Sequence, residues 1–281
     1  MTRPFVKMNG AGNDFVVVNA LETPFAPTAE QARAIADRET GQGCDQLIAI
    51  EPSANPQSGA DAFMRVWNAD GGSVETCGNA LRCVGWILMQ STGKDRVVID
   101  TVAGPTTARQ EQDGRVTVDM GAPRLDWSQI PLDEAMDTRG IELQVGPIDD
   151  PVLHTPGAVS MGNPHVVFFM DHAPNDAFVR GTGSLVEHHP RFPEGVNVGF
   201  AHVGARDRIR LRVWERGAGL TKACGSGACA ALVAAARRGL TGRTAVIEVD
   251  GGELGIDWDE ATDHVLMTGP VEVERTGTLS I

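Results

Sequence analysis

Two cysteines with matching surroundings are the residues whose type and spacing best suit chemistry in this 281-residue chain. The tripeptide Arg-Val-Trp stands at residues 65–67 before Cys77 and at residues 212–214 before Cys224, at the same interval. A glycine and then an apolar run containing alanine follow each cysteine. A thiolate can take a proton and a thiol can return one, so the matched pair predicts proton exchange at one carbon acid from two sides.

Each of these cysteines is expected where a turn becomes a helix. The apolar runs at residues 80–90 and 228–238 predict buried helices that begin just after Cys77 and Cys224. A helix N-terminus carries free N–H groups and a partial positive charge, so we expect the pKa of both thiols to be lowered from about 8.5. The same N–H groups are expected to hold a carboxylate, and they belong to Gly78, Asn79, Gly225 and Ser226.

The two cysteine segments are part of a longer internal repeat. Similar segments recur in the same order at an offset of about 150 residues, namely 12–17 with 162–167, 43–46 with 195–198, and the two cysteine motifs. This repetition predicts an α+β fold of two pseudo-symmetric domains. Each would be a mixed, mainly antiparallel sheet curled around a central helix, with the active site in the cleft between them. The expected domains are residues 1–123, completed by 269–281, and residues 124–268.

Local patterns predict the elements that must position the cysteines. Alternating or β-branched runs predict strands at residues 64–67, 96–100, 116–120, 210–214 and 245–249. The capping box Thr28-Ala29-Glu30-Gln31 predicts a helix that ends near Gly41. Gly- and Pro-rich stretches at residues 121–123 and near 146–147 are expected to be domain junctions.

Composition narrows the class of protein and its partners. The formal net charge of −13 argues against nucleic acid and anionic membranes as partners. No apolar run approaches the ~20 residues of a membrane span, and the N-terminal residues lack a signal-peptide core, so a cytoplasmic location is expected. Five cysteines without a CxxC pair predict free thiols and no zinc site. We expect Cys44, Cys83 and Cys229 to be core residues, and a disulfide between the two motif cysteines to be an inactive oxidation product.

At these motifs the chain resembles the diaminopimelate epimerase family, within a wider fold group that includes proline racemases. The resemblance spans essentially the whole chain and rests on residues 7–15, 43–46, 67–71, 77–79, 161–165, 195–200, 215–219 and 223–228. It implies interconversion of LL- and meso-2,6-diaminopimelate, a step toward lysine and peptidoglycan, without pyridoxal phosphate, metal or any other cofactor. A homodimer is also implied, although Arg275 stands where the family often has an aromatic residue.

The same resemblance assigns roles to individual residues. Cys77 and Cys224 look like the acid–base pair, and His165 and Glu215 look like residues that tune their protonation. The polar shell around the substrate would consist of Asn13, Gln46, Asn68, Asn163, Asn197, Glu215 and Arg216. Such a shell suits a substrate with a distal amino-acid end, because that end needs a cation for its carboxylate and acceptors for its ammonium group.

Three alternatives differ from this interpretation in substrate or in chemistry. A proline or hydroxyproline racemase would also use two cysteines, but its substrate has no distal end for Arg216 to hold. An amino-acid-binding protein would need no pair of thiols. An isomerase of the related fold group with an acidic base would leave the matched cysteines without a role.

Overall fold

The computed structural model describes residues 2–55 and 57–280, and the chain divides into two compact units. Unit 1 consists of Met1–Asp119 and Thr268–Ile281, and unit 2 consists of Met120–Met267. The C-terminal segment returns to unit 1 because its last strand pairs with the first strand of the chain. Within the described residues, none of the helices combines the length and the apolar content that a membrane span requires.

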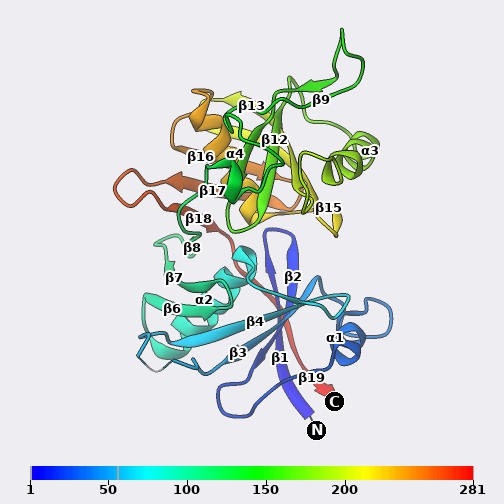
Figure 1. The fold of residues 1–281 in the computed structure, drawn as a ribbon. Coiled ribbons are helices and arrows are strands. Elements are labelled where there is room, and N and C mark those ends of the chain that lie inside the picture. The colour runs from blue at the N-terminus through cyan, green and yellow to red at the C-terminus, as the bar shows by residue number, and fades with distance from the viewer. Residues whose placement is uncertain (1, 56, 281) are drawn as a thin grey trace. The chain divides into compact units, whose positions relative to one another are not determined.

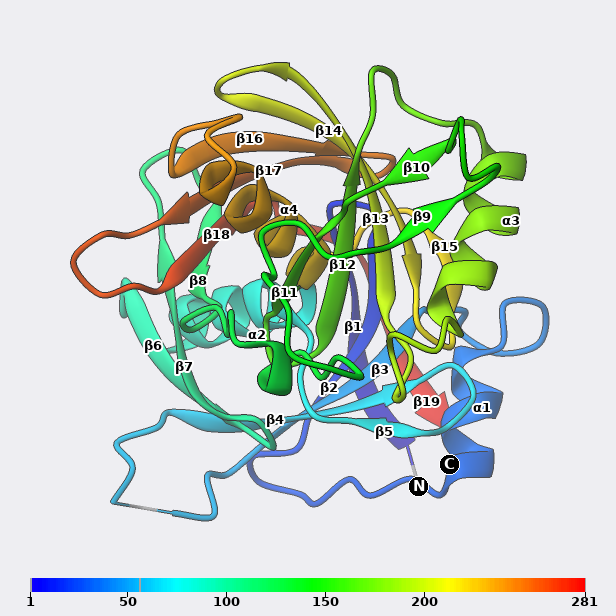
Figure 2. The same ribbon diagram turned by 45° about the horizontal axis from the view of Figure 1, so that its top comes forward.

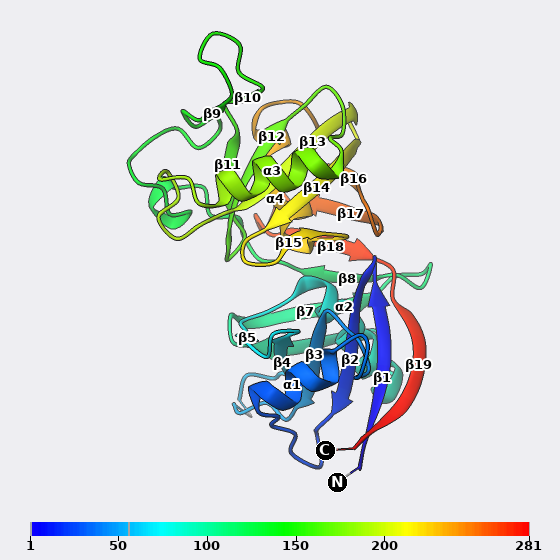
Figure 3. The ribbon, with the colours of Figure 1, turned by 90° about the vertical axis from the view of Figure 1, so that its right-hand side faces the viewer.

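Unit 1 is a mainly antiparallel sheet with two helices. Its elements are β1 (Thr2–Gly10), β2 (Asn13–Asn19), α1 (Ala29–Ala36), β3 (Gln46–Glu51), β4 (Ala62–Asn68), β5 (Ser73–Val74), α2 (Gly78–Thr92), β6 (Arg96–Thr101), β7 (Gly104–Gln110), β8 (Val116–Asp119) and β19 (Glu272–Ser280). Only two of the pairings described in this unit, β2 with β3 and β4 with β6, are parallel. Strand β1 lies between β2 and β19 (Figure 3).

Helix α2 is the central helix of unit 1. It packs against β6, β7 and β8 as well as β1 and β2 (Figure 1). Most of its residues are buried. Its close approach to β7 depends on Gly85, where an added Cβ would lie 2.4 Å from the Cβ of Ala108. Because most residues of the helix are apolar, packing against several strands buries that surface, together with Asn79 and Arg82.

Unit 2 repeats the plan. Its elements are η1 (Trp127–Gln129), β9 (Gln144–Val145), β10 (Leu153–His154), β11 (Gly157–Ser160), β12 (Pro164–Phe169), α3 (Asp176–Glu187), β13 (Asn197–Ala205), β14 (Arg208–Glu215), β15 (Gly219–Thr221), α4 (Gly225–Arg237), β16 (Thr244–Val249), β17 (Gly252–Trp258) and β18 (Val265–Gly269), which runs past the unit's last residue. Its parallel pairs are β12 with β13 and β14 with β16. Strands β9 and β10 form a separate two-stranded sheet (Figure 2).

The repetition of elements confirms the predicted class of two similar sheet-and-helix domains. Each unit has two parallel strands joined through a peripheral helix, β2-α1-β3 and β12-α3-β13. Each then has an antiparallel partner, a short strand, a buried helix and a further antiparallel hairpin. Helix α4, like α2, packs against strands on several sides and is buried over most of its length.

Two local predictions are wrong. Helix α1 ends at Ala36 and not near Gly41, because Asp37 leaves the helical conformation and its carboxylate accepts hydrogen bonds from the N–H groups of Glu39 and Thr40. Residues 146–147 are no domain junction, because they lie in the connection between β9 and β10 inside unit 2. In both places a turn-forming residue closes a local loop.

Candidate active site

Cys77 occupies the N-cap of α2, with an extended backbone at φ −147° and ψ 115°. Its thiol lies 3.9 Å from Oδ1 of Asn13, at the start of β2. The first N–H groups of α2, from Gly78 onward, have no acceptor within the helix. The structure therefore places a thiol beside the positive end of a helix, which is a suitable place for an anionic group.

The amide of Asn13 is oriented by a carboxylate that the sequence did not single out. Nδ2 of Asn13 donates to Asp45 Oδ2 at 2.6 Å, which leaves Oδ1 on the side of Cys77. Oδ1 also accepts from Nδ2 of Asn79 at 3.4 Å. The carbonyl oxygen of Asn13 thus faces the thiol. Asp45 lies in the 43–46 segment, directly before the predicted site residue Gln46. That position in the sequence could have identified it.

A network of charged side chains, partly exposed, holds that carboxylate in place. Arg38 donates to both Asp14 and Asp45, and Lys7, itself buried, donates to Asp14. Burial by itself raises the pKa of Asp14, but the hydrogen bonds from Arg38 and Lys7 outweigh it and hold the pKa well below the usual range. Both carboxylates are fixed in this way on the strand ends that carry Asn13 and Gln46.

Gln46 and Asn68 form a second polar pair in unit 1. They face each other across the antiparallel strands β3 and β4, and Nε2 of Gln46 donates to Oδ1 of Asn68 at 2.9 Å. Oε1 of Gln46 is buried and has no hydrogen-bond partner in the structure. A buried acceptor without a donor is costly, so this oxygen is suited to a ligand's N–H group.

Cys224 occupies the N-cap of α4 and is 5% exposed. Its sulfur accepts a hydrogen bond from the N–H of Gly227 at 3.3 Å and lies 3.6 Å from Oγ of Ser226. Glu215, at the end of β14, is also hydrogen-bonded to this thiol. The sulfur therefore meets one carboxylate and two potential donors.

The expected lowering of the pKa is wrong for Cys224. Burial raises its pKa well above the ordinary value, and the charge of Glu215 raises it further. The hydrogen bonds from Ser226 and from the N–H of Gly227 act in the opposite direction but are weaker. A helix N-terminus favours a thiolate, but this sulfur is enclosed beside a carboxylate, and both burial and the negative charge favour the protonated thiol. Cys224 is therefore a thiol at neutral pH.

His165 lies on β12 as a fully enclosed, neutral imidazole. Its Nε2 is 3.0 Å from Oδ1 of Asn163 and 3.0 Å from Oγ of Ser226. Burial, together with the positive charge of Arg216, lowers the pKa of His165 to about 3. Its link to the thiol of Cys224 runs through the hydroxyl of Ser226.

Asn197 and Arg216 are held together at the start of β13. Nδ2 of Asn197 donates to the carbonyl of Pro164, and its Oδ1 accepts from the N–H of Arg216 at 2.9 Å. The Arg216 guanidinium donates to the carbonyl of Glu194. The turn after Glu215 is thus tied to the start of β13 by one amide side chain.

Glu187, at the end of α3, also holds this turn. Its buried carboxylate accepts from Nε1 of Trp214 at 2.7 Å and from the N–H of Gly217 at 2.9 Å. The sequence analysis missed Glu187, because nothing within its own helix marks a glutamate whose partners lie on another element.

The site residues predicted from the sequence form two groups, one in each unit. Unit 1 carries Asn13, Gln46, Asn68, Cys77, Gly78 and Asn79. Unit 2 carries Asn163, His165, Asn197, Glu215, Arg216, Cys224, Gly225 and Ser226. None of the five cysteines, all of which lie in the described residues, forms a disulfide, and Cys44, Cys83 and Cys229 are buried. In the described part of the chain, no cluster of three or more His, Cys, Asp or Glu side chains is arranged to hold a metal ion.

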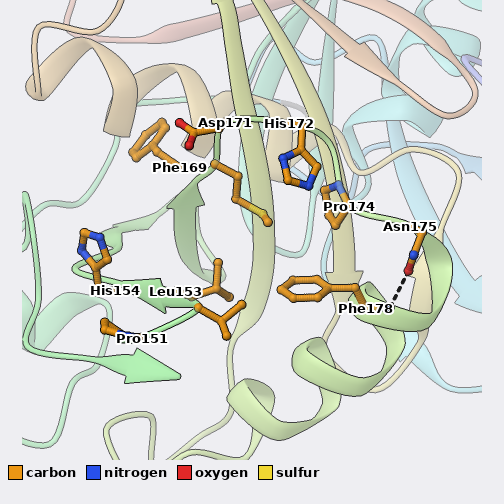
Figure 4. Close-up of a pocket in the computed structure, with 11 residues that line it drawn as sticks. Pro151, Leu153, His154, Phe169, Asp171, His172, Pro174, Asn175 and Phe178 are labelled. Carbon is orange, nitrogen blue, oxygen red and sulfur yellow. Dashed lines mark hydrogen bonds between the residues drawn. The ribbon is translucent and has the colours of Figure 1, made fainter. Parts of the chain in front are cut away.

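A cavity of about 450 Å³ in unit 2 is separate from these groups (Figure 4). It is lined by residues of the β9–β10 region, the end of β12 and the start of α3, among them His154, Phe169, His172 and Phe178. None of the predicted site residues lines it. The candidate chemistry therefore belongs to the two cysteine groups and not to this cavity.

Solved structures with the same fold define the class of protein. A hydroxyproline epimerase from Agrobacterium vitis has a TM-score of 0.68 at 15% identity, covering 99% of this chain and 91% of that one. A phenazine biosynthesis PhzF-family protein from Enterococcus faecalis has a TM-score of 0.70 at 14% identity, covering 100% of both chains. The chain thus has the fold shared by these epimerase and PhzF-type proteins.

Sequence relatives define the family within that fold class. The family model described as "Diaminopimelate epimerase" matches residues 5–125 and 157–274. A diaminopimelate epimerase of Caulobacter sp. (strain K31) is 64% identical, and one of Phenylobacterium zucineum (strain HLK1) is 60% identical. Each alignment covers 99% of this chain and 98% of the relative. The chain belongs to the diaminopimelate epimerase family and is an enzyme, an epimerase of the isomerase class.

Proposed function

We propose that this enzyme interconverts LL- and meso-2,6-diaminopimelate by exchanging one proton between Cys77 and Cys224, without a cofactor. The observation that carries the proposal is that both cysteines stand at the N-cap of the buried helix in two units of the same topology. The reaction would take place in the cytoplasm and supply a precursor of lysine and peptidoglycan. The family membership supports the substrate, because the relatives are named for it.

Loss of the α-proton leaves a carbanion whose charge spreads onto the neighbouring carboxylate. The first N–H groups of α2 and α4, led by Gly78 and Gly225, are suited to hold that carboxylate as its charge grows. A thiolate on one face takes the proton, the thiol on the other face gives one, and the centre inverts. Closure of the two groups of residues around one substrate is part of this proposal.

The two-base exchange requires one thiol and one thiolate at the start of each turnover. The raised pKa of Cys224 supports its assignment as the thiol that donates in the resting enzyme. Cys77 would then be the base for the first direction. After one turnover the roles are exchanged, and the reverse reaction restores them.

The distal amino-acid end of the substrate would be held by the polar shell. Arg216 would bind the distal carboxylate, and the unpartnered Oε1 of Gln46 is suited to accept from the distal ammonium group. Asn13, Asn68, Asn163 and Asn197 would supply the remaining donors and acceptors. This division of roles explains why one end of a symmetric substrate reacts and the other does not.

The direct test is incubation of the purified, reduced protein with LL-diaminopimelate, with separation of the meso isomer. Cys77→Ala and Cys224→Ala should each lower the rate by about a hundredfold to ten-thousandfold, because each removes an acid–base group. Cys44→Ala, at a buried cysteine outside the proposed site, is the control and should keep substantial activity. Circular dichroism reports whether each variant is folded. Turnover of proline or hydroxyproline in place of diaminopimelate would overturn the substrate assignment.

A further inference from the structure

The hydroxyl of Ser226 lies at the meeting point of three polar groups. Its Oγ is 3.3 Å from Nδ2 of Asn163, 3.0 Å from Nε2 of His165 and 3.6 Å from Sγ of Cys224. Ser226 is the second residue of α4, so its hydroxyl projects from the same helix end that carries the cysteine. The backbone N–H of Ser226 is part of the proposed carboxylate site, and its hydroxyl is a separate group that faces the thiol of Cys224.

The hydrogens around this hydroxyl can be assigned from its neighbours. The amide of Asn163 directs Nδ2 at Ser226 and Oδ1 at His165. Because Oδ1 only accepts, the neutral imidazole must carry its hydrogen on Nε2. Oγ of Ser226 therefore accepts from Nδ2 of Asn163, and the protonated Nε2 of His165 has no lone pair to accept the hydrogen of this hydroxyl. Its own hydrogen is left for the remaining neighbour, Sγ of Cys224.

Several groups face the sulfur of Cys224 from the elements packed around it. From β14, the carboxylate of Glu215 opposes ionisation of the thiol. From α4 itself, the N–H of Gly227 favours ionisation. His165 on β12 is neutral, and the cation of Arg216 acts on His165. The hydroxyl of Ser226 is thus one of two donors that can offset burial and Glu215.

We propose that the Ser226 hydroxyl donates to Sγ of Cys224 and stabilises its thiolate form, with Asn163 and His165 fixing the direction of that hydroxyl. Ser226 would then be a positioning residue that makes the buried Cys224 able to act as a base as well as an acid. This inference rests on the proposed function of Cys224 in proton exchange. It assigns His165 an indirect role, through the hydroxyl and not through its own charge.

The test measures ionisation of Cys224 without substrate. The chain contains no tyrosine, so its ultraviolet thiolate absorbance is free of overlap with tyrosinate. The titration is made in a Cys77→Ala background, and the same protein with Cys224→Ala added is subtracted to remove the other three cysteines. Ser226→Ala should move the thiolate titration of Cys224 upward by about one pH unit, as expected for loss of a hydrogen bond to a charged group.

Two matched variants complete the experiment. Ser226→Thr retains a hydroxyl that can make the same hydrogen bond. Its Cys224 thiolate titration should therefore lie within roughly a few tenths of a pH unit of the parent. Ser226→Gly also lacks the hydroxyl and should show the same upward shift. It takes the place of Ser226→Ala if that variant does not fold. Circular dichroism at each pH defines the usable range. Equal titration of the serine, threonine and hydroxyl-free proteins would overturn the proposal.

The titration also separates this inference from the proposed function. A protein that fails to turn over diaminopimelate but shows the expected shift would refute the substrate assignment alone. A protein that turns over diaminopimelate and shows no shift would refute the role of Ser226 alone.

Discussion

The two motif cysteines have different immediate surroundings, although they occupy the same place in the repeat. The sulfur of Cys224 is approached by N–H and O–H donors and by the carboxylate of Glu215. The sulfur of Cys77 has the carbonyl oxygen of Asn13 at 3.9 Å, turned toward it by Asp45. A duplicated backbone therefore supplies matched positions, while individual side chains distinguish the two thiols.

At the residue scale, His165 predicts a loss of stability in mild acid. Its pKa is lowered from 6.5 to about 3 on folding, so between these values the unfolded chain binds a proton that the folded chain does not. Stability then falls as pH falls below about 6.5, by up to about 1.4 kcal/mol per pH unit from this group. Urea unfolding at a series of pH values measures the slope.

The variant His165→Gln isolates that contribution. It should be less stable near neutrality but lose less free energy of unfolding between about pH 6.5 and 4.5, because no imidazole is left to protonate. His154→Gln, at an exposed histidine, should keep the slope of the parent. An unchanged slope in His165→Gln would show that His165 is not responsible.

At the scale of elements, peripheral helix α3 supports the turn that carries Arg216. Glu187 at its end accepts from the indole of Trp214 and from the N–H of Gly217. The helix can approach β14 closely because residue 183 is glycine and has no Cβ. An added Cβ at Gly183 would lie 2.5 Å from Cβ of Trp214. The end of β14 is therefore held by a helix as well as by its hydrogen-bonded neighbours β13 and β15.

Glu187→Ala tests the support of this turn. It leaves two donors without their acceptor and should lower the free energy of unfolding by about 2 kcal/mol. It should also raise KM for diaminopimelate more than it lowers kcat, because Arg216 is proposed to bind the distal end. Glu253→Ala, which removes an exposed ion pair with Arg208, should change stability by less than about 1 kcal/mol. A larger effect on kcat than on KM in Glu187→Ala would contradict the assignment.

At the scale of the whole molecule, the proposed reaction needs one cysteine from each unit. The taking and giving groups then belong to different parts of the chain, and the abstracted proton is not returned to the face it left. In deuterated water, early product should carry deuterium at the inverted centre, while recovered substrate stays largely unlabelled. Mass spectrometry of both isomers at low conversion measures this. Equal early labelling of substrate and product would indicate a single base.

Much of this arrangement could be predicted from the sequence because its signals are local. The capping box at Thr28, the alternating strands and the apolar runs after both cysteines each involve a few neighbouring residues, and the structure confirms these elements apart from the end of α1. The internal repeat needs only comparison of the chain with itself, and it predicted the two similar sheets. The same motifs identified the family to which the relatives assign the chain.

The tertiary structure alone decided the electrostatics around these residues. The pKa of Cys224 is raised because burial and Glu215 outweigh the helix end, whereas the motifs named Glu215 as a tuning residue without the direction of its effect. The orientation of the Asn13 amide depends on Asp45, and the turn at Arg216 depends on Glu187, partners many residues distant in the chain. Hydrogen bonds and desolvation depend on positions in space to within an ångström or so. Packing of distant segments sets those positions, whereas helix caps and strand periodicity are set by nearest neighbours.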